Sequence, residues 1–409
     1  RPPNNWKAII GGSAWEWCEA RQQFYLHQFL PCQPDLNWWN PAVQEAMLGH
    51  LKFWLDKGVD GFRLDIIHTL FEDKNFRDNP MSRRLFPNKN TNAFLFQKPK
   101  YTQFLPETIA ICKELRKIVD SYSPPRMLVG EAVGNPELYK PLYGKNNNGL
   151  HLVFNFAFGE KPFSAQEFRK GLLQSERLLP EPFWPCYVFS NHDSVRMISR
   201  YGNNPLKARL ITMLLLTIRG TPFIYMGEEI GMRQVSVPRK QQKDPIAFHR
   251  LYGIPIGRFF GRDGCRTPFQ WTASPLNAGF SQDPTVSPWL PVHENCSKIN
   301  VQDQLGKENS MLTYYQQLLQ LRKKHPALQT GTLTILPEKR KHLLTYTRNH
   351  KKETLVILLN FSTQQKHVPL FSEKYQFIFS SQFSGKPTQI EKQVILLPFE
   401  GKIMQKLVV

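Results

Sequence analysis

The stretch GVDGFRLDIIH, residues 58–68, has the apolar residues of a buried strand and ends in a charged pair. Alternate residues of a strand point to the same face, so Arg63 and Asp65 are predicted to lie side by side. An apolar strand that presents a cation and a carboxylate together indicates a strand whose carboxyl end forms part of a site.

Helices and strands alternate around this stretch. Apolar residues recur at helical spacing over 41–57, with Pro41 in the first turn and Gly58 at the end. Further helices are predicted at 107–119, 205–219 and 311–324, and strands at 59–65, 127–131, 151–156, 186–193 and 222–227. Short apolar strands separated by helices favour an α/β fold with parallel strands.

Polar residues stand where three of these strands end. Asp65 ends the first, Glu131 ends the second, and Asn191, His192 and Asp193 end a third. Functional groups at carboxyl ends of strands are typical of (β/α)8 barrels and of doubly wound sheets. No glycine-rich phosphate loop follows a strand, which weighs against a nucleotide-binding fold.

The pattern of predicted helices and strands divides the chain into three parts. Residues 1–40 are rich in Trp, Asn, Pro and Gly and read as a loop-rich segment. Residues 41–328 carry the alternating helices and strands. Residues 329–409 carry strand-like runs without helices between them, which predicts a small antiparallel β-domain.

Composition excludes some classes of protein. The chain has 409 residues, 41% of them hydrophobic, which is enough for a sizeable core, and no run reaches the roughly 18 apolar residues of a membrane span. Six scattered cysteines form no metal-binding or disulfide pattern, which favours the cytoplasm. The net charge of +20 makes nucleic acid a hypothesis, but the basic clusters read as solvated surface, and no nucleic-acid or membrane partner is predicted.

Two carboxyl groups on either side of a sugar are the usual equipment of glycoside hydrolysis. One is protonated and donates to the leaving oxygen, while the other is ionised and attacks the anomeric carbon. A neighbouring cation favours the ionised form of a carboxyl group. Arg63 therefore makes Asp65 the better candidate for the nucleophile.

Several motifs in the same order resemble the α-amylase superfamily, glycoside hydrolase family 13, and within it the oligo-1,6-glucosidase and α-glucosidase branch. GFRLD (61–65) resembles its nucleophile motif, LVGEA (128–132) its acid/base motif and SNHD (190–193) its transition-state motif. QPDLN (33–37), PFIYMGEEIGM (222–232) and GRDGCRTPFQW (261–271) also resemble that branch.

The resemblance implies a (β/α)8 barrel and a retaining α-glucosidase acting on terminal bonds of short α-glucosides, without a cofactor or catalytic metal. It implies that Asp65 forms the glycosyl-enzyme and that Glu131 acts as acid and then base. Asp193 stabilises the oxocarbenium-like state. Retention predicts carboxyl groups of Asp65 and Glu131 about 5–5.5 Å apart.

The same resemblance implies four supporting residues. Arg63 orients and ionises Asp65, and His192 hydrogen-bonds the sugar in the first subsite. Arg196 supports that pocket, and Arg266 lines it near the aglycone.

The sequence departs from the family at its start. The first family motif and the first barrel strands are absent, and residues 1–40 resemble the remainder of the excursion domain. The chain thus resembles the C-terminal three-quarters of a longer enzyme, and any structural calcium would belong to the missing part. A barrel without its first strands has open edges, so we expect residues 1–409 alone to be poorly soluble and inactive.

Two residues after the nucleophile bear on specificity. In this branch, Val directly after the nucleophile accompanies α-1,6 cleavage and Thr accompanies α-1,4 cleavage. Ile66 is aliphatic and favours acceptance of α-1,6 bonds, whereas FSNHDSVR (189–196) and GRDGC (261–265) resemble general α-glucosidases, so the linkage preference stays open. His68 stands one position short of the amylase histidine, so it is expected on the surface or on the aglycone side.

Alternative functions share the fold. One is a trehalose-6-phosphate hydrolase, and another is a glucosyl transferase or isomerase. A third is a non-catalytic relative of the transporter heavy chains, which have lost the acids that this chain retains. The natural substrate and the oligomeric state do not follow from the sequence.

Overall fold

The structure is a computed structural model and describes residues 1–85, 93–134, 136–248, 261–283, 285–369, 374–382, 389–390 and 393–407. The chain divides into two compact units. The N-terminal unit contains Arg1–Ala157 and Leu178–Cys186. The C-terminal unit contains Phe158–Arg177, Tyr187–Ala247 and the described chain from residue 261 onward.

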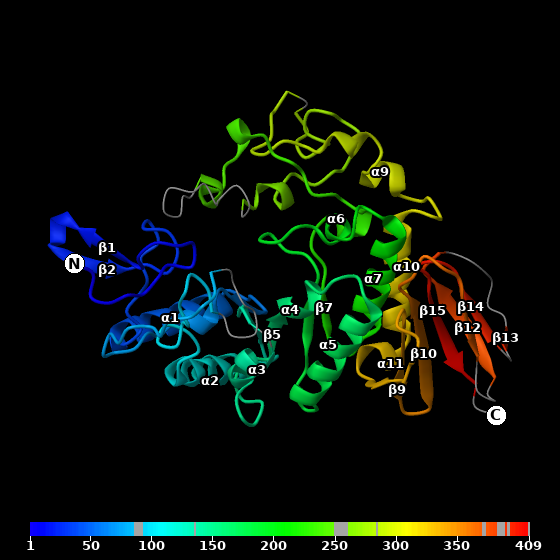
Figure 1. Cartoon of the computed structure of the whole chain (residues 1–409), viewed down its shortest axis with the longest axis horizontal. Helices are drawn as coiled ribbons and strands as arrows, with labels where there is room; N and C mark the ends of the chain where they lie inside the picture. Colours follow the sequence, from blue (N-terminus) through cyan, green and yellow to red (C-terminus); the bar gives the residue numbers. More distant parts are fainter. Residues whose placement is uncertain are drawn as a thin grey trace. The chain divides into compact units, whose positions relative to one another are not determined.

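The N-terminal unit opens with an antiparallel hairpin of β1 (Trp15–Cys18) and β2 (Gln23–Leu26). Helix α1 (Pro41–Asp56) begins where the Asn40 side chain accepts a hydrogen bond from the N–H of Ala42. Three strands with further helices follow (Figure 1): β3 (Gly61–Leu64), α2 (Pro106–Asp120), β4 (Met127–Gly130), α3 (Pro136–Tyr139), β5 (Leu152–Asn155) and α4 (Phe156–Gly159).

Strands β3, β4 and β5 are parallel, and their register positions the predicted acids. Leu64 lies opposite Gly130, so Asp65 and Glu131 each follow directly on a matched pair. Strands β3 and β4 approach closely at Gly61, where a Cβ atom would lie 2.1 Å from the carbonyl oxygen of Met127. Apolar residues of α1, α2 and the strands form one core, including Leu51, Leu55, Ile111, Leu115, Leu128 and Val153.

The C-terminal unit carries strands β6 (Cys186–Val188) and β7 (Thr221–Phe223), β6 starting at the boundary between the units. Its helices are α5 (Ala165–Leu178), α6 (Met197–Arg200), α7 (Pro205–Thr217), α9 (Val301–Gln304), α10 (Met311–Lys324) and α11 (Pro326–Gln329). Helix α7 is buried along most of its length and runs beside α10 (Figure 1). Residues of α7, α10 and the C-terminal strands share one core, including Leu210, Leu214, Leu318, Leu355 and Ile357.

The C-terminal strands form antiparallel sheets, as predicted. The larger sheet has the order β13-β12-β15-β10-β9-β8, and β11 pairs with β14. The strands are β8 (Thr332–Ile335), β9 (Leu343–His350), β10 (Glu353–Asn360), β11 (Lys366–Pro369), β12 (Tyr375–Ser380), β13 (Gln389–Ile390), β14 (Gln393–Leu396) and β15 (Gly401–Lys406). The domain boundaries predicted at 40/41 and 328/329 stay predictions.

All five predicted strands end earlier than expected, by one residue in β3, β4 and β5 and by four or five residues in β7 and β6. The predicted strand 59–65 is β3, which ends at Leu64 because Ile66 adopts a left-handed conformation, with φ of 34°. The predicted strand 186–193 is β6, which ends at Val188. The Asn191 side chain accepts hydrogen bonds from the N–H of Asp193 and the hydroxyl of Ser194, which folds this segment into a turn.

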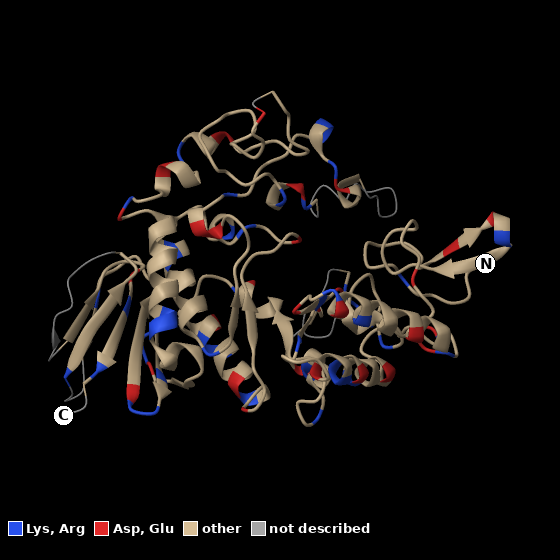
Figure 2. Ribbon diagram, turned by 180° about the vertical axis from the view of Figure 1, so that it is seen from behind, with Lys and Arg blue, Asp and Glu red and all other residues tan. Residues whose placement is uncertain are grey.

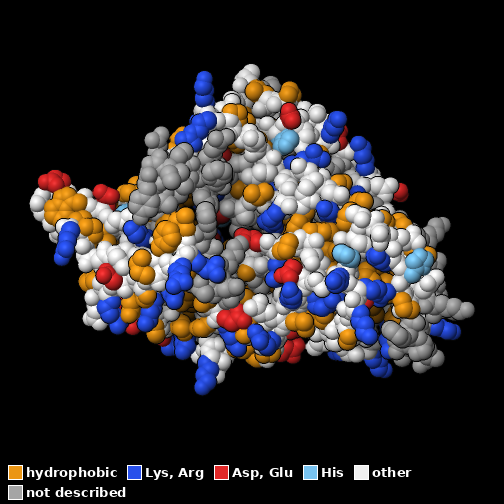
Figure 3. Space-filling model, in the orientation of Figure 1, with side chains coloured by type: hydrophobic (Ala, Val, Ile, Leu, Met, Phe, Trp, Pro, Cys, Tyr) orange, Lys and Arg blue, Asp and Glu red, His pale blue; other side chains and the backbone are white. Residues whose placement is uncertain are grey.

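Charge is spread over many elements. Lys and Arg alternate with Asp and Glu along α2 and occur on the helices and strands of both units (Figure 2). On the face drawn in Figure 3, basic side chains are interspersed with acidic, polar and apolar ones. None of the described helices is long and apolar enough to cross a membrane. The cytoplasmic location and the absence of a nucleic-acid partner stay predictions.

The six cysteines are free thiols. Cys32 is exposed and Cys18 is half-buried, whereas the other four are buried: Cys112, Cys186, Cys265 and Cys296. No group of three or more His, Cys, Asp or Glu residues suited to a metal ion occurs in the part of the chain that the structure describes.

Candidate active site

Arg63 joins the first two predicted acids. One guanidinium nitrogen of Arg63 contacts a carboxylate oxygen of Asp65, and the other contacts a carboxylate oxygen of Glu131. The Asp65 side chain is 70% exposed, whereas that of Glu131 is 9% exposed. The contact with Asp65 is the predicted one, and the contact with Glu131 was not predicted, because it joins two strands 68 residues apart in sequence.

Backbone hydrogen bonds hold these acids in place beyond the ends of their strands. The N–H of Glu131 donates to the carbonyl of Leu64 at 2.8 Å, and the N–H of Ile67 donates to the carbonyl of Glu131 at 3.0 Å. The left-handed turn at Ile66 lies between these two bonds. The positions of Asp65 and Glu131 are therefore set by the parallel pairing of β3 with β4.

His68 is buried, so a surface position was wrong, and an aglycone-side position stays a prediction. Only 1% of the residue is exposed, and its ring centroid lies 4.9 Å from that of Phe104. Among the described residues, neither ring nitrogen has a hydrogen-bond partner of ordinary geometry, although the backbone of Glu131 interacts with the ring and opposes the effect of burial on its pKa. Burial lowers the pKa of His68 to about 4, so the imidazole is neutral at physiological pH.

Hydrogen bonds connect the QPDLN segment to the loop that follows Asp65. The backbone N–H of Gln28 donates to Asp35 at 2.6 Å, and its side-chain amide donates to the carbonyl of Thr69 and to Glu72. Burial raises the pKa of Glu72 to about 8 and that of Asp35 to about 6, and the negative charge of Asp35 adds to the effect on Glu72. Gln28 thus connects two carboxyl groups that resist ionisation.

The third predicted acid, in the C-terminal unit, lies between two arginines. One carboxylate oxygen of Asp193 accepts from Arg266 at 2.7 Å and from Arg262 at 2.9 Å. The Nε of Arg266 also donates to the carbonyl of His192 at 2.7 Å. The His192 imidazole lies 3.4 Å from the other oxygen of Asp193 and is half exposed. The predicted residues Asp193, His192 and Arg266 are therefore in direct contact.

Arg262 and Asp244 were not predicted as site residues. Arg262 forms an ion pair with the carboxylate of Asp244, whose side chain is fully buried. Burial raises the pKa of Asp244, but the hydrogen bonds and charge of Arg262 outweigh it, and the net shift is downward. The sequence could have indicated Arg262, because it and the predicted Arg266 flank the same turn in GRDGCRTPFQW. Asp244 carried no such signal, because its partner is 18 residues away.

Arg196 lies beneath this group and is 1% exposed. Its guanidinium donates to the carbonyls of Met226 at 2.7 Å and Cys265 at 3.0 Å and lies over the Tyr225 ring. Burial lowers the pKa of Arg196. Because its donors are directed at backbone carbonyls, Arg196 holds the loop around Cys265 in place through hydrogen bonds.

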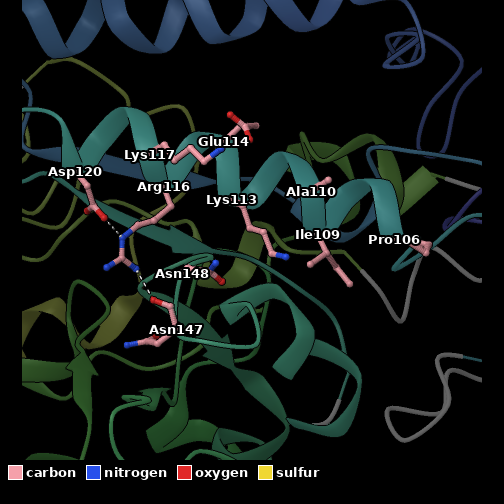
Figure 4. Close-up of a pocket in the computed structure, with 10 residues that line it drawn as sticks. All are labelled: Pro106, Ile109, Ala110, Lys113, Glu114, Arg116, Lys117, Asp120, Asn147 and Asn148. Atoms are coloured by element: carbon pink, nitrogen blue, oxygen red, sulfur yellow. Dashed lines mark hydrogen bonds and ion pairs between the residues drawn. The ribbon is translucent and has the colours of Figure 1, made fainter.

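A surface cavity of about 690 Å³ lies elsewhere, along α2 and the segment of Asn147 and Asn148 (Figure 4). None of the predicted site residues lines it. Arg116 crosses it and is held by Asp120 and by the carbonyl of Asn147. The lining has no carboxyl pair like that of Asp65 and Glu131, so its size does not make it the better candidate.

Comparisons with known proteins place these residues in context. A family profile described as "Alpha amylase, catalytic domain" matches residues 1–331. A probable alpha-glucosidase of Rhizobium meliloti is 38% identical, over 90% of this chain and 67% of the relative. An oligo-1,6-glucosidase of Parageobacillus thermoglucosidasius is 31% identical, over 98% of this chain and 75% of the relative.

Solved structures are similar over almost the whole chain. An alpha-glucosyl transfer enzyme, XgtA, is 32% identical with a TM-score of 0.87, covering 99% of this chain and 75% of its own. The isomaltulose synthase of Erwinia rhapontici is 28% identical with a TM-score of 0.84, covering 99% of this chain and 76% of its own. These likenesses confirm the predicted α/β fold, with parallel barrel strands followed by a C-terminal antiparallel sheet.

Proposed function

Because the chain belongs to the α-amylase family, glycoside hydrolase family 13, we propose that it is a retaining α-glucosidase acting on terminal α-glucosidic bonds of short oligosaccharides. The observation that carries the proposal is the contact of one guanidinium group, that of Arg63, with both Asp65 and Glu131. A single guanidinium between two carboxyl groups suits the short separation, about 5–5.5 Å, of retaining enzymes.

The proposed reaction has two displacements. The Asp65 carboxylate attacks C1 of the terminal glucose while Glu131 gives its proton to the glycosidic oxygen, and the bond between C1 and that oxygen breaks. Water then attacks C1 of the glycosyl-enzyme while Glu131 takes a proton from it, and Asp65 leaves as a carboxylate. The product keeps the α configuration because C1 is inverted twice.

The roles of the other residues are carried over from the family resemblance. Asp193 and His192 bind sugar hydroxyls, and Asp193 stabilises positive charge that develops at the anomeric carbon. Arg266 and Arg262 orient the Asp193 carboxylate, to which both donate. Arg196 is proposed as a positioning residue rather than a sugar contact, because it is 1% exposed.

Asp65→Asn tests the proposed function in assays with maltose, isomaltose, sucrose and trehalose 6-phosphate. In the longer enzyme that the family resemblance implies, we expect activity on maltose or isomaltose, and we expect Asp65→Asn to lower kcat by at least about 10³-fold because the amide cannot form the glycosyl-enzyme. Asp60→Asn is the control, since Asp60 precedes the same strand and pairs with Arg126. Full activity of Asp65→Asn would refute the mechanism.

A glucosyl transferase or isomerase is the second candidate, favoured by the likeness to XgtA and to the isomaltulose synthase. The glycosyl-enzyme is common to both candidates, and they differ in whether water or a second sugar attacks it. Product analysis with sucrose separates them, because hydrolysis releases glucose and fructose whereas an isomerase returns a disaccharide. Preference for trehalose 6-phosphate would instead indicate the phosphorylated substrate. The expected inactivity of residues 1–409 alone stays a prediction, which the same assays test.

A further inference from the structure

The motif PFIYMGEEIGM places a buried carboxyl group, that of Glu228, in the C-terminal unit. Glu228 begins the short 3₁₀ helix Glu228–Ile230 and is 5% exposed. Neither of its carboxyl oxygens accepts a hydrogen bond of ordinary geometry from the residues that the structure describes. The side chain of Ser190 is close enough to interact with Glu228, but a buried carboxylate with so little hydrogen bonding is costly, so this group requires an explanation.

The charged groups around Glu228 are Arg196, Arg200 and Glu229, and Tyr315 faces it from α10. Both arginines direct donors at backbone carbonyls: Arg196 at Met226 and Cys265, and Arg200 at Gly159, Phe189 and Val195. Glu229 accepts from the N–H of Gly227 at 2.7 Å. Glu228 is thus near two cations without a close ion pair to either.

This environment is connected to Asp193 by two short routes. Ser190, whose side chain interacts with that of Glu228, precedes the turn Asn191–His192–Asp193, and its hydroxyl oxygen accepts from the N–H of Met197. The second route passes through Arg196 to the carbonyl of Cys265, which also accepts from Tyr225. Cys265 adjoins Arg266, the residue that donates to Asp193 and to the carbonyl of His192.

We propose that Glu228 is a positioning residue for Asp193. When Glu228 is a neutral acid, Arg196 keeps its hydrogen bonds to the carbonyls of Met226 and Cys265. When Glu228 is a carboxylate, it draws Arg196 away from them. Loss of those bonds loosens the segment that carries Arg266 and, with it, the hold on Asp193. Burial raises the pKa of Glu228 to about 7, against the opposing effects of Ser190 and the arginines, so both forms are populated near neutral pH. The consequence for catalysis rests on the proposed function.

The first test is independent of activity. Hydrogen–deuterium exchange of residues 188–195, corrected for the intrinsic pH dependence of exchange, is measured at pH 6 and pH 8. We expect faster corrected exchange at pH 8 in the wild type and no such change in Glu228→Gln, whose side chain is neutral at both pH values. Glu228→Asp keeps a titrating carboxyl group and should retain the change.

Glu229→Gln is the matched control, because it removes the neighbouring carboxyl group and leaves Glu228 and Ser190 in place. Equal effects of Glu228→Gln and Glu229→Gln would overturn the proposal, since they would indicate a response to the net charge of the cluster. Equal corrected exchange in the wild type at both pH values would overturn it as well.

The second test follows kcat/KM for p-nitrophenyl α-glucoside from pH 5 to pH 9, since this leaving group needs little proton donation and the contribution of Glu131 is reduced. If only the protonated form of Glu228 is competent, kcat/KM of the wild type falls about tenfold from pH 6 to pH 8, and Glu228→Gln keeps most of its activity. Superimposed profiles would overturn the proposal. If the longer enzyme that the family resemblance implies has no activity but residues 1–409 show the expected exchange, the proposed function is refuted and the exchange result stands.

Discussion

Arg63 is the residue on which the candidate site depends most directly. Lys at position 63 keeps the charge but has one nitrogen, so it cannot contact Asp65 and Glu131 in the way a planar guanidinium does. We expect Arg63→Lys to lower kcat about a hundredfold with a smaller effect on KM, because misplacing a reacting group costs about that much. Steady-state kinetics on maltose and isomaltose measure both constants.

Arg126→Lys is the control for this substitution. Arg126 forms an ion pair with Asp60 at the opposite end of the β3–β4 pair, where no site residue is predicted. It should leave kcat within about twofold. Equal losses in the two variants would mean that both arginines act only on the stability of the sheet.

Ile66 offers a second prediction at the scale of a residue. It directly follows Asp65 and adopts a left-handed conformation, which turns the chain out of β3. By the family resemblance, Ile66→Thr should raise the ratio of maltose to isomaltose hydrolysis, measured as the ratio of kcat/KM values. Ile66→Val keeps an aliphatic, β-branched side chain and should leave the ratio unchanged, and an unchanged ratio in Ile66→Thr would remove this role.

Local sequence was sufficient for some residues of the site and insufficient for others. The contact of Arg63 with Asp65 follows from strand alternation over two positions. The contact of Arg63 with Glu131 depends on the pairing of two distant strands, and the burial of His68 depends on the packing of Phe104. Neither of these contacts leaves a local pattern.

At the scale of elements, the segments that follow β7 contribute Arg262, which contacts the predicted site residue Asp193. Asp244 holds Arg262, which donates to Asp193. Asp244→Asn removes the ion pair, so we expect kcat/KM to fall about ten- to a hundredfold because Arg262 is no longer held against Asp193. Asp283→Asn is the control, since among the described residues the side chain of Asp283 bonds only to Thr285. Equal kinetics in both variants would exclude a role of Asp244.

Each of the four predicted helices occurs in the structure, whereas the 14-residue helix α5 was not predicted. Helix α10 has the predicted bounds, 311–324, α1 ends one residue before its predicted end, and α2 is one residue longer than predicted at each end. Their apolar spacing is a local signal, as are the proline in the first turn of α1 and of α2 and the capping Ser310 of α10. The strand β6 ends five residues before Asp193, where a longer strand was predicted. The prediction failed because the Asn191 side chain forms a turn through hydrogen bonds that the apolar pattern of the sequence does not indicate.

At the scale of the whole molecule, buried carboxyl groups in both units predict how stability depends on pH. The pKa of Glu72 is raised from 4.5 to about 8, that of Glu228 from 4.5 to about 7 and that of Asp35 from 3.8 to about 6. Between the lower and the upper values the folded chain binds more protons than the unfolded chain. These groups therefore lower the free energy of unfolding as pH rises from about 5 to about 8.

Thermal unfolding from pH 5 to pH 9 measures this dependence. Self-repulsion from the net charge of +20 weakens toward the isoelectric point near 9.7 and opposes the effect, so the comparison is made between variants. Glu72→Gln should make the fall in Tm with rising pH smaller, whereas Glu114→Gln, at an exposed pair with Lys117, should not. A fall of equal size in wild type and Glu72→Gln would show that Glu72 does not retain its proton.

Because one thiol is exposed, a fluorescent label can be attached next to the QPDLN segment. Cys32 is the one exposed cysteine of the six, and it stands three residues before Asp35. A maleimide fluorophore should therefore react there first, and Cys18→Ser would make the labelling selective. Its anisotropy, followed during a pH titration, would report whether the peptide around Asp35 gains rotational freedom when the carboxyl groups near Gln28 lose their protons.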